Sequence, residues 1–210
     1  MDLENKILID ISPVISSKTA VFPGDIPFQQ EFHLKIERGH NLDLSSIKST
    51  VHIGAHTDAP CHYDEKGLSI EKRDLRYYIG SAQVIEVACA RGERIFPHHL
   101  TQDIKAKRVL FKTNSFPNPD QWNDDFVALS TELIEFLAQN EVILVGLDTP
   151  SVDLAQDQSL ESHKSIYKHD MAILEGIVLK DVDAGLYDLI CLPLKIAGAE
   201  ASPVRAILLK

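Results

Sequence analysis

The sequence predicts an α/β protein, a single domain over residues 1–210 with a mixed, strand-rich sheet. Short apolar runs of strand length recur along the whole chain, and only three segments suit a helix. With 44% apolar residues the chain can bury a substantial core. No internal repeat, low-complexity stretch or linker divides it, so one domain is the simplest organisation.

Most of the predicted strands are short. Residues 7–11 form an apolar run that ends at a serine–proline pair, and residues 142–147 are continuously apolar, as in a strand covered on both faces. Apolar and polar residues alternate over 45–53, which predicts a half-buried strand with His52 near its end on the polar face. The remaining predicted strands are 82–87, 108–112, 173–179, 187–194 and 204–209.

Helices are predicted at 97–107, 130–140 and 159–169. The second is the best supported, because Ser130 can cap it and Glu132 suits the positive end of the helix dipole. Turn residues and prolines predict loops at 21–25, 114–125 and 153–158.

The chemistry of the chain is concentrated in residues 52–62. This segment holds three imidazoles and one carboxylate, on His52, His56, Asp58 and His62. Neutral imidazoles and carboxylates are the ligands of zinc and similar divalent metals. Four such groups rarely gather for packing alone, because each needs a partner when it is buried. The pattern therefore favours a metal site, and with it a hydrolase or lyase that activates water.

The backbone of this segment is expected to form a loop. Gly54 lets the chain bend after the predicted strand, and Pro60 keeps Ala59 extended. His56, Asp58 and His62 would then lie on a loop delivered by a strand, where functional groups often sit.

Several residues keep more than one interpretation. Asp58 alone could cap a turn, and Glu175, inside the apolar run 172–179, needs either a metal or an arginine as its partner. A free imidazole at His62 suits general acid–base catalysis, but it could also be a fourth ligand or a surface residue. Cys61 could act as a thiol nucleophile, but the neighbouring histidines and aspartate favour a metal site over this interpretation.

Composition excludes some classes of partner. The formal net charge of −10 argues against binding to nucleic acid and to anionic membrane surfaces. The three cysteines lie far apart in the sequence and form no Cys-x-x-Cys motif, which fits a reducing compartment better than a disulfide framework. The polar N-terminus lacks the features of a signal peptide. Together these observations predict a cytoplasmic protein. No apolar stretch reaches membrane-spanning length.

The histidine segment and several others resemble a known family. The pattern His52-x-x-x-His56-x-Asp58-x-Pro60-x-His62 is similar to the signature of the metal-dependent cyclase-like hydrolases. Within that family the chain most resembles the arylformamidases. The similarity continues, in order, through segments 10–13, 22–28, 146–153, 169–176, 187–195 and 202–206.

This resemblance implies a swivelling β/β/α fold, a homodimer or larger assembly, and two zinc ions per subunit. By match, His52, His56 and Asp58 would hold one zinc, with Asp58 also reaching the second. His163 and Glu175 would complete the pair, with Glu175 bridging both ions. Manganese tolerates the same ligand set. His62 matches the position of the catalytic acid–base.

The implied reaction is the hydrolysis of N-formyl-L-kynurenine to L-kynurenine and formate, a step of tryptophan degradation. The chain departs from the arylformamidase pattern at one position. Phe22 stands where the arylformamidases typically have a tryptophan that contacts the substrate. Phenylalanine keeps an aromatic face but loses the indole N–H. The alternatives are another amide or a cyclic amide such as isatin, a non-catalytic metal protein on the same fold, and a purely structural histidine cluster.

Overall fold

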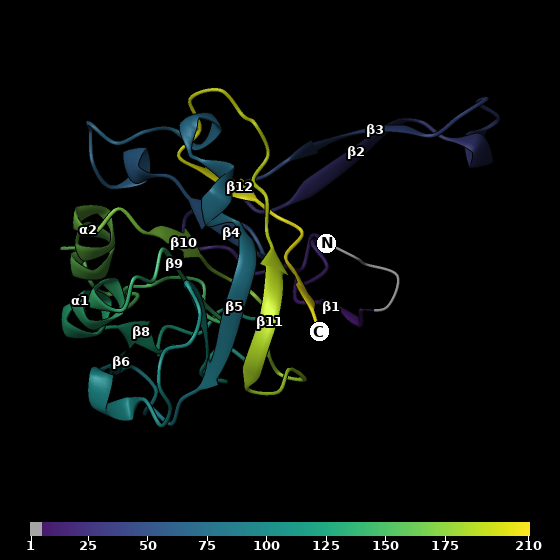
Figure 1. Ribbon diagram of the computed structural model, residues 1–210. Coiled ribbons are helices and arrows are strands. Elements are labelled where there is room, and N and C mark those ends of the chain that lie inside the picture. The colour runs from purple at the N-terminus through teal and green to yellow at the C-terminus, as the bar shows by residue number, and fades with distance from the viewer. Residues whose placement is uncertain (1–5) are drawn as a thin grey trace.

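In the computed structural model, which describes residues 6–210, seven strands form one mixed sheet in the order β1-β13-β11-β5-β7-β9-β10 (Figure 1). These strands are β1 (Leu8–Asp10), β5 (Ile79–Glu86), β7 (Arg108–Lys112), β9 (Leu144–Leu147), β10 (Ala172–Leu174), β11 (Gly185–Ile190) and β13 (Ile207–Leu209). The predicted α/β class with a mixed sheet is confirmed. The polar start of the chain, residues 1–5, lies outside the described residues.

The sheet has a parallel half and an antiparallel half. Strands β5, β7, β9 and β10 run parallel, whereas β11, β13 and β1 pair antiparallel along the other side. Every residue of β9 and β10 is buried. Burial on both faces is why these strands consist of continuous apolar runs rather than alternating ones.

Helices α1 (Thr131–Gln139) and α2 (Glu161–Lys168) both pack beside the parallel half of the sheet (Figure 1). The Ser130 hydroxyl accepts a hydrogen bond from the backbone N–H of Leu133 at 3.0 Å, as predicted for the cap of α1. A buried cluster that includes Leu133, Leu137 and Phe111 joins the helix to the sheet. A second apolar cluster includes Leu110 and residues of the antiparallel half.

Three short strand pairs lie outside the main sheet: β4 (His56–Asp58) with β12 (Ala201–Pro203), β2 (Gln29–Leu34) with β3 (Leu44–Lys48), and β6 (Arg94–Ile95) with β8 (Ala128–Leu129). Apart from β3, these strands were not predicted. Strands β4, β12, β6 and β8 have only two or three residues, too few to show a period, and β2 is largely polar and exposed.

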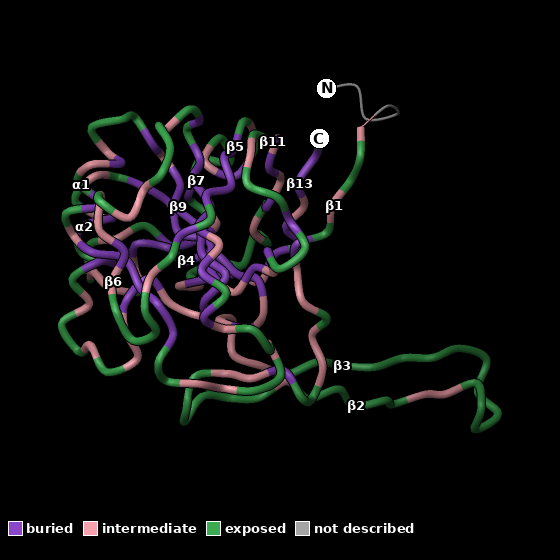
Figure 2. Tube along the Cα trace, turned by 90° about the horizontal axis from the view of Figure 1, so that it is seen from below, coloured by how far each residue is buried: buried purple, intermediate pink, exposed green. Residues whose placement is uncertain are grey.

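The predicted strand 45–53 is wrong in its extent and its burial. Strand β3 ends at Lys48, and His52 lies in the irregular segment between β3 and β4. Together β2 and β3 form a hairpin that projects from the body of the molecule and is largely exposed (Figures 1 and 2). Ile47 is 69% exposed. Alternation predicts two faces of a strand, but it does not show that either face meets a core.

The predicted helix 97–107 is also wrong. Only a 3₁₀ turn, Pro97–His99, forms there. Further along, the side chain of Gln83 on β5 accepts from the backbone N–H of Lys105 at 2.7 Å and donates to the carbonyl of Asp103 at 3.0 Å. A neighbouring strand therefore supplies the hydrogen bonds that the turns of a helix would have made.

Between residues 6 and 210, no helix has the length and apolar character needed to cross a bilayer.

Candidate metal centre

Strand β4 places two of the predicted site residues on one face. Because successive side chains of a strand alternate, His56 and Asp58 point to the same side and Thr57 to the other. The backbones of His56 and Glu175 exchange hydrogen bonds of 3.0 and 2.9 Å directly after β10. The structure thus corrects the expected loop: His56 and Asp58 lie on a short strand, and a backbone bridge brings Glu175 alongside.

Two glycines make this close approach possible. Gly54 and Gly176 both have positive φ angles, of 57° and 65°. A Cβ atom built on Gly176 would lie 2.2 Å from the carbonyl oxygen of Gly54. The same carbonyl lies 2.9 Å from Nδ1 of His56 and accepts a hydrogen bond from it, which turns Nε2 of that ring toward the carboxylates.

Five predicted metal ligands converge at this point: His52, His56, Asp58, His163 and Glu175. The Asp58 carboxylate lies 3.1 Å from His52 Nδ1, 3.7 Å from His56 Nε2 and 3.5 Å from His163 Nε2. The Glu175 carboxylate lies 3.1 Å from His56 Nε2 and 3.9 Å from His163 Nε2. Helix α2 supplies His163, so three separate parts of the chain meet here.

The donor set fits a divalent metal. Four of its buried atoms, Nε2 of His52, Nε2 of His56 and both carboxylate oxygens of Asp58, have no hydrogen-bond partner of good geometry among the described residues. Unpaired buried polar atoms are costly. Metal bonds of 2.0–2.2 Å at tetrahedral angles would hold ligand atoms about 3.3–3.6 Å apart, close to the separations observed.

The imidazoles and carboxylates of the cluster shift one another's pKa values. Burial alone would lower the pKa of His56, but Glu175 and Asp58 raise it to about 9. Burial likewise opposes the charge of His163, yet Asp153 and Asp58 raise its pKa to about 10. Burial favours protonated Asp58, but contacts with His163 and His52 hold its pKa well below the usual value.

His62 stands beside the cluster and is exposed. It belongs to the 3₁₀ turn Pro60–His62, and its ring centre lies 4.3 Å from that of His52. Nitrogen of His62 also comes within 4.8 Å of ligand atoms of Asp58 and His163. Packing against its neighbours partly desolvates the His62 ring although its outer edge is exposed; this desolvation, opposed by the charge of Asp58 and aided by His52 and His163, lowers the pKa of His62, so its ring is mainly neutral at pH 7.

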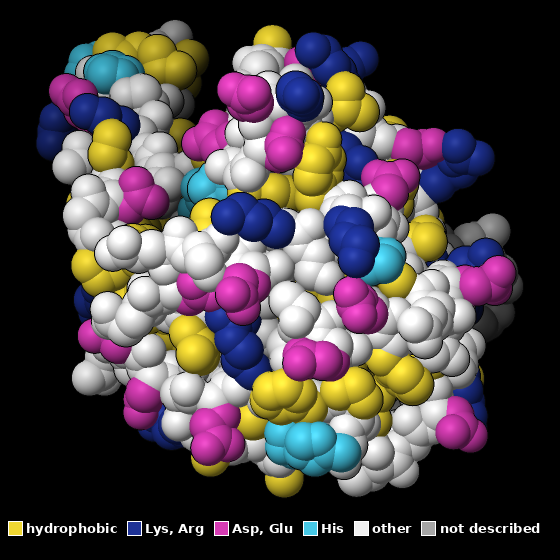
Figure 3. Space-filling view, turned by 90° about the vertical axis from the view of Figure 1, so that its left-hand side faces the viewer, with side chains coloured by type: hydrophobic (Ala, Val, Ile, Leu, Met, Phe, Trp, Pro, Cys, Tyr) yellow, Lys and Arg dark blue, Asp and Glu magenta, His cyan; other side chains and the backbone are white. Residues whose placement is uncertain are grey.

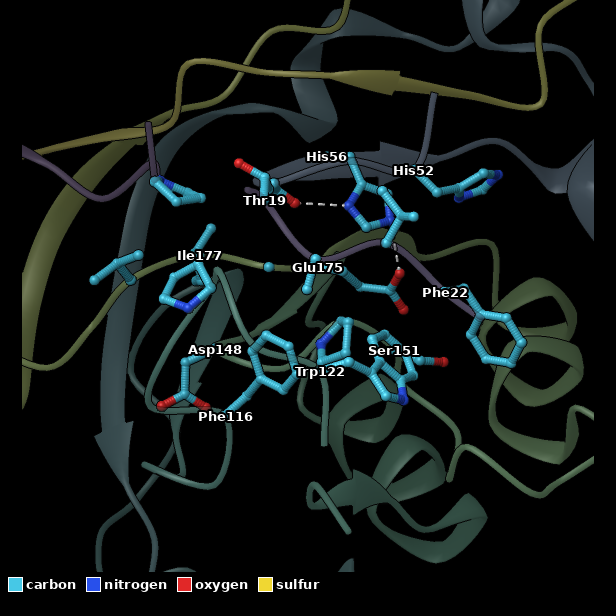
Figure 4. A pocket seen from close by; sticks show the side chains of 18 of the residues that line it. Thr19, Phe22, His52, His56, Phe116, Trp122, Asp148, Ser151, Glu175 and Ile177 are labelled. Carbon is cyan, nitrogen blue, oxygen red and sulfur yellow. Dashed lines mark hydrogen bonds and ion pairs between the residues drawn. The ribbon is translucent and has the colours of Figure 1, made fainter. Parts of the chain in front are cut away.

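The cluster forms one wall of a pocket of about 730 Å³ (Figure 4). Aromatic side chains of two loops, Phe22, Phe116 and Trp122, line the same pocket. Phe22 is 48% exposed and meets Trp122 edge to face, with ring centroids 5.3 Å apart. Trp122, the only tryptophan of the chain, lies in the predicted loop 114–125 but was not predicted to line the pocket.

Other residues are not brought to the pocket. Arg205 is exposed and pairs with Asp10, while Ser202 is buried and bonded to backbone. The Cys61 thiol hydrogen-bonds to a backbone carbonyl, and burial raises its pKa, which disfavours a thiolate nucleophile. His33, His40, His98 and His99 do not line the pocket.

Comparison with known proteins places this fold and cluster in a family. The model of the Cyclase family matches residues 9–154, and the chain belongs to that family. Among curated relatives, the kynurenine formamidase of Bordetella petrii is 44% identical over 205 residues, which cover 97% of this chain and 98% of the relative. The kynurenine formamidase of Bordetella pertussis is 43% identical, with the same coverage of both chains.

Solved structures agree with the fold. A protein described as a potential metal-dependent hydrolase with cyclase activity is 25% identical, with a TM-score of 0.83 over 97% of this chain and 98% of the other. Isatin hydrolase A from Labrenzia aggregata shares the fold at 20% identity, with a TM-score of 0.79 over 97% of this chain and 93% of the other.

Proposed function

We propose that this protein is a metal-dependent arylformamidase that hydrolyses N-formyl-L-kynurenine to L-kynurenine and formate. The observation that most supports this is the 44% identity, over nearly the full length of both chains, to a curated kynurenine formamidase. The convergence of three imidazoles and two carboxylates at the pocket supplies the chemistry such a reaction needs.

The proposed metal is zinc, with two ions per subunit. His52, His56 and Asp58 would hold one ion, and His163 and Glu175 would complete the second, with Asp58 and Glu175 each shared. Glu175 can face two ions because its two oxygens approach different imidazoles, at His56 and at His163. Manganese accepts the same ligands, so metal analysis of protein from defined media would decide the ion.

When bound, the metal ions supply Lewis acidity, which activates water near neutral pH and polarises the formyl carbonyl. His62 is the proposed acid–base. Its neutral ring would accept the proton of the attacking water and return it to the aryl amine nitrogen as the C–N bond breaks. The buried carboxylates of Asp58 and Glu175 cannot take this role while they hold metal.

The rest of the pocket suits an aromatic amino-acid substrate. Phe22, Phe116 and Trp122 offer faces and edges for an aryl ring. Among the pocket-lining residues, Lys180 is the only lysine or arginine, and the proposed role of its ammonium group is to attract the substrate carboxylate. Trp122 adds an indole ring beside Phe22, but its N–H donates to Asp124 at 2.5 Å and so does not replace the donor that phenylalanine lacks.

The direct test is to incubate zinc-loaded protein with N-formyl-L-kynurenine and follow the absorbance of kynurenine, with a chelator-treated control. Fast turnover that chelation abolishes is the expected result. Two bound metals without turnover would overturn the substrate assignment. Isatin, offered in parallel, would then show whether the same centre opens a cyclic amide.

The proposed assembly is a homodimer formed through the projecting hairpin. Its side chains Ile36, Leu44 and Ile47 are 62%, 51% and 69% exposed, and hydrophobic groups gather at its end (Figure 3). Apolar surface of this kind indicates a protein contact, and a second copy is the partner available in purified protein. Light scattering should report a dimer, and Ile47→Ser should weaken it; a monomeric wild-type protein would contradict this assignment.

A further inference from the structure

A charged pair lies directly behind His163, on the side away from the pocket. Nδ1 of His163 is 2.8 Å from the Asp153 carboxylate, and Asp153 is only 1% exposed. Arg94, from β6, bonds the other oxygen of Asp153 at 2.8 Å. The same guanidinium nitrogen also donates to the Ser162 hydroxyl at 2.7 Å and to the carbonyl of Leu129 at 2.6 Å.

Asp153 also starts the helix that supplies His163. The residue before α2, Leu160, has a left-handed φ of 52° and provides no side-chain cap. Instead, Asp153 accepts hydrogen bonds from the backbone N–H groups of Ser162, at 3.0 Å, and His163, at 3.1 Å. One buried carboxylate thus fixes both the backbone and the ring of His163.

This arrangement determines which nitrogen of His163 faces the cluster. Since Nδ1–H donates to Asp153, Nε2 is directed toward Asp58 and Glu175, at 3.5 and 3.9 Å. A carboxylate behind an imidazole orients the ring and increases its basicity as a ligand. His56 has a neutral partner in the same position, the carbonyl of Gly54.

We propose that Asp153, held in place by Arg94, is a positioning residue that sets the metal affinity of the half-site containing His163. This inference rests on the proposed function in one respect, namely that His163 is a metal ligand. Asp153 itself does not line the pocket and would touch neither metal nor substrate.

The test compares Asp153→Asn with the matched control Asp157→Asn. Asp157 bonds the same arginine but makes no contact with His163. We expect Asp153→Asn to weaken the binding of one of two zinc ions by about 10- to 100-fold and to leave the other nearly unchanged. Asp157→Asn should leave both affinities within about twofold. Competition with a chromophoric chelator measures both.

A merely structural role of Asp153 as a helix cap makes a different prediction. It would lower the melting temperature of the metal-free protein without changing either zinc affinity or the visible spectrum of the cobalt-substituted protein. That result would overturn the proposal. A changed cobalt spectrum in Asp153→Asn, with an unchanged one in Asp157→Asn, supports it.

If Asp153→Asn fails to fold, Arg94→Lys provides the second variant. Lysine keeps the charge, but it is shorter and has one nitrogen in place of the two that bond Asp153 and Asp157, so Asp153 should be held less firmly and one zinc affinity should still fall several-fold. Unchanged affinities in a folded Arg94→Lys protein would overturn the role of Arg94. Turnover of N-formyl-L-kynurenine by the wild-type protein is scored separately, so a wrong substrate does not affect these binding results.

Discussion

The two ends of the pocket are built differently. At the cluster end, His56, Asp58, His163 and Glu175 are at most 3% exposed, and a strand, a backbone bridge and a helix hold them. At the aromatic end, Phe22 is 48% exposed and comes, like Phe116 and Trp122, from a loop.

This contrast shows how the fold separates reaction from recognition. Buried ionisable groups are interdependent, so loss of one leaves its partners unsatisfied. Exposed aromatic contacts each contribute a small, graded amount. Substitutions at the cluster should therefore abolish function, and substitutions at the loops should adjust it.

The largest effect is expected for Asp58→Asn. Asp58 contacts three imidazoles, and its replacement removes the charge that they share. We expect loss of bound zinc and a fall in kcat of about 10³-fold or more, measured by elemental analysis and turnover. Glu65→Gln, an exposed change seven residues further along the chain, is the control and should behave as the wild type.

His62→Ala should separate catalysis from metal binding. Because His62 is exposed and is proposed as acid–base rather than ligand, kcat should fall by about 10²–10⁴-fold while zinc content stays the same. Zinc content is measured on the same sample as turnover. Zinc lost together with activity would make His62 a ligand and would refute the proposed role.

The cluster also predicts a pH dependence. His56 and His163, with pKa values of about 9 and 10 in the metal-free fold, bind protons more tightly than unfolded histidines, which titrate near 6.5. Their contribution to the stability of the metal-free fold is complete below pH 6.5 and is lost as the pH rises through 9 and 10.

Zinc requires the neutral rings, so its affinity should rise over the same range. The increase in melting temperature caused by a fixed, subsaturating amount of zinc should therefore grow from pH 6.5 to pH 9. Thermal scans with and without zinc measure this difference. A zinc effect that shrinks with rising pH would contradict the assignment of these two imidazoles.

At the aromatic end, Phe22→Ala should raise KM for N-formyl-L-kynurenine by about 2- to 10-fold with little change in kcat. Steady-state kinetics give both constants. Phe22→Trp, which adds the indole usual at this position, should keep KM at or below the wild-type value. A large fall in kcat for Phe22→Ala would mean that this end of the pocket also orients the reacting bond.

The smallest effect is expected for Lys180→Met. An exposed ammonium group contributes little, so KM for N-formyl-L-kynurenine should rise only about 2- to 5-fold. N-formylaniline has no carboxylate, and its KM should not change. Equal effects on both substrates would show that Lys180 does not recognise the amino-acid end.

Elements with a local signal in the sequence were predicted correctly. A continuous apolar run predicted the buried strand β9, a short apolar stretch predicted β7, and a serine before an apolar stripe predicted α1. The residue types in segment 52–62 identified His56 and Asp58 as candidate ligands, but the glycine and proline of this segment predicted a loop where the structure has strand β4. Resemblance, rather than spacing, nominated His163 and Glu175, which the structure brings to the same point.

Elements that depend on contacts distant in sequence were not predicted. Nothing near residues 97–107 shows that Gln83 will take up the backbone groups of this segment. The hairpin at β3 has the alternation of a half-buried strand but no core beneath it. Asp153 is ten residues from His163 and resembles any loop aspartate until α2 is folded against it.

The contact between Gly54 and Gly176 also has a consequence for protein engineering. A Cβ atom at residue 176 would lie 2.2 Å from the carbonyl oxygen of Gly54. Any residue other than glycine at this position would therefore separate His56 from Glu175. Mutant libraries screened for new substrates should vary positions 22, 116 and 122 freely and keep glycine at positions 54 and 176. Variation there would yield proteins that have lost their chemistry before their selectivity can be tested.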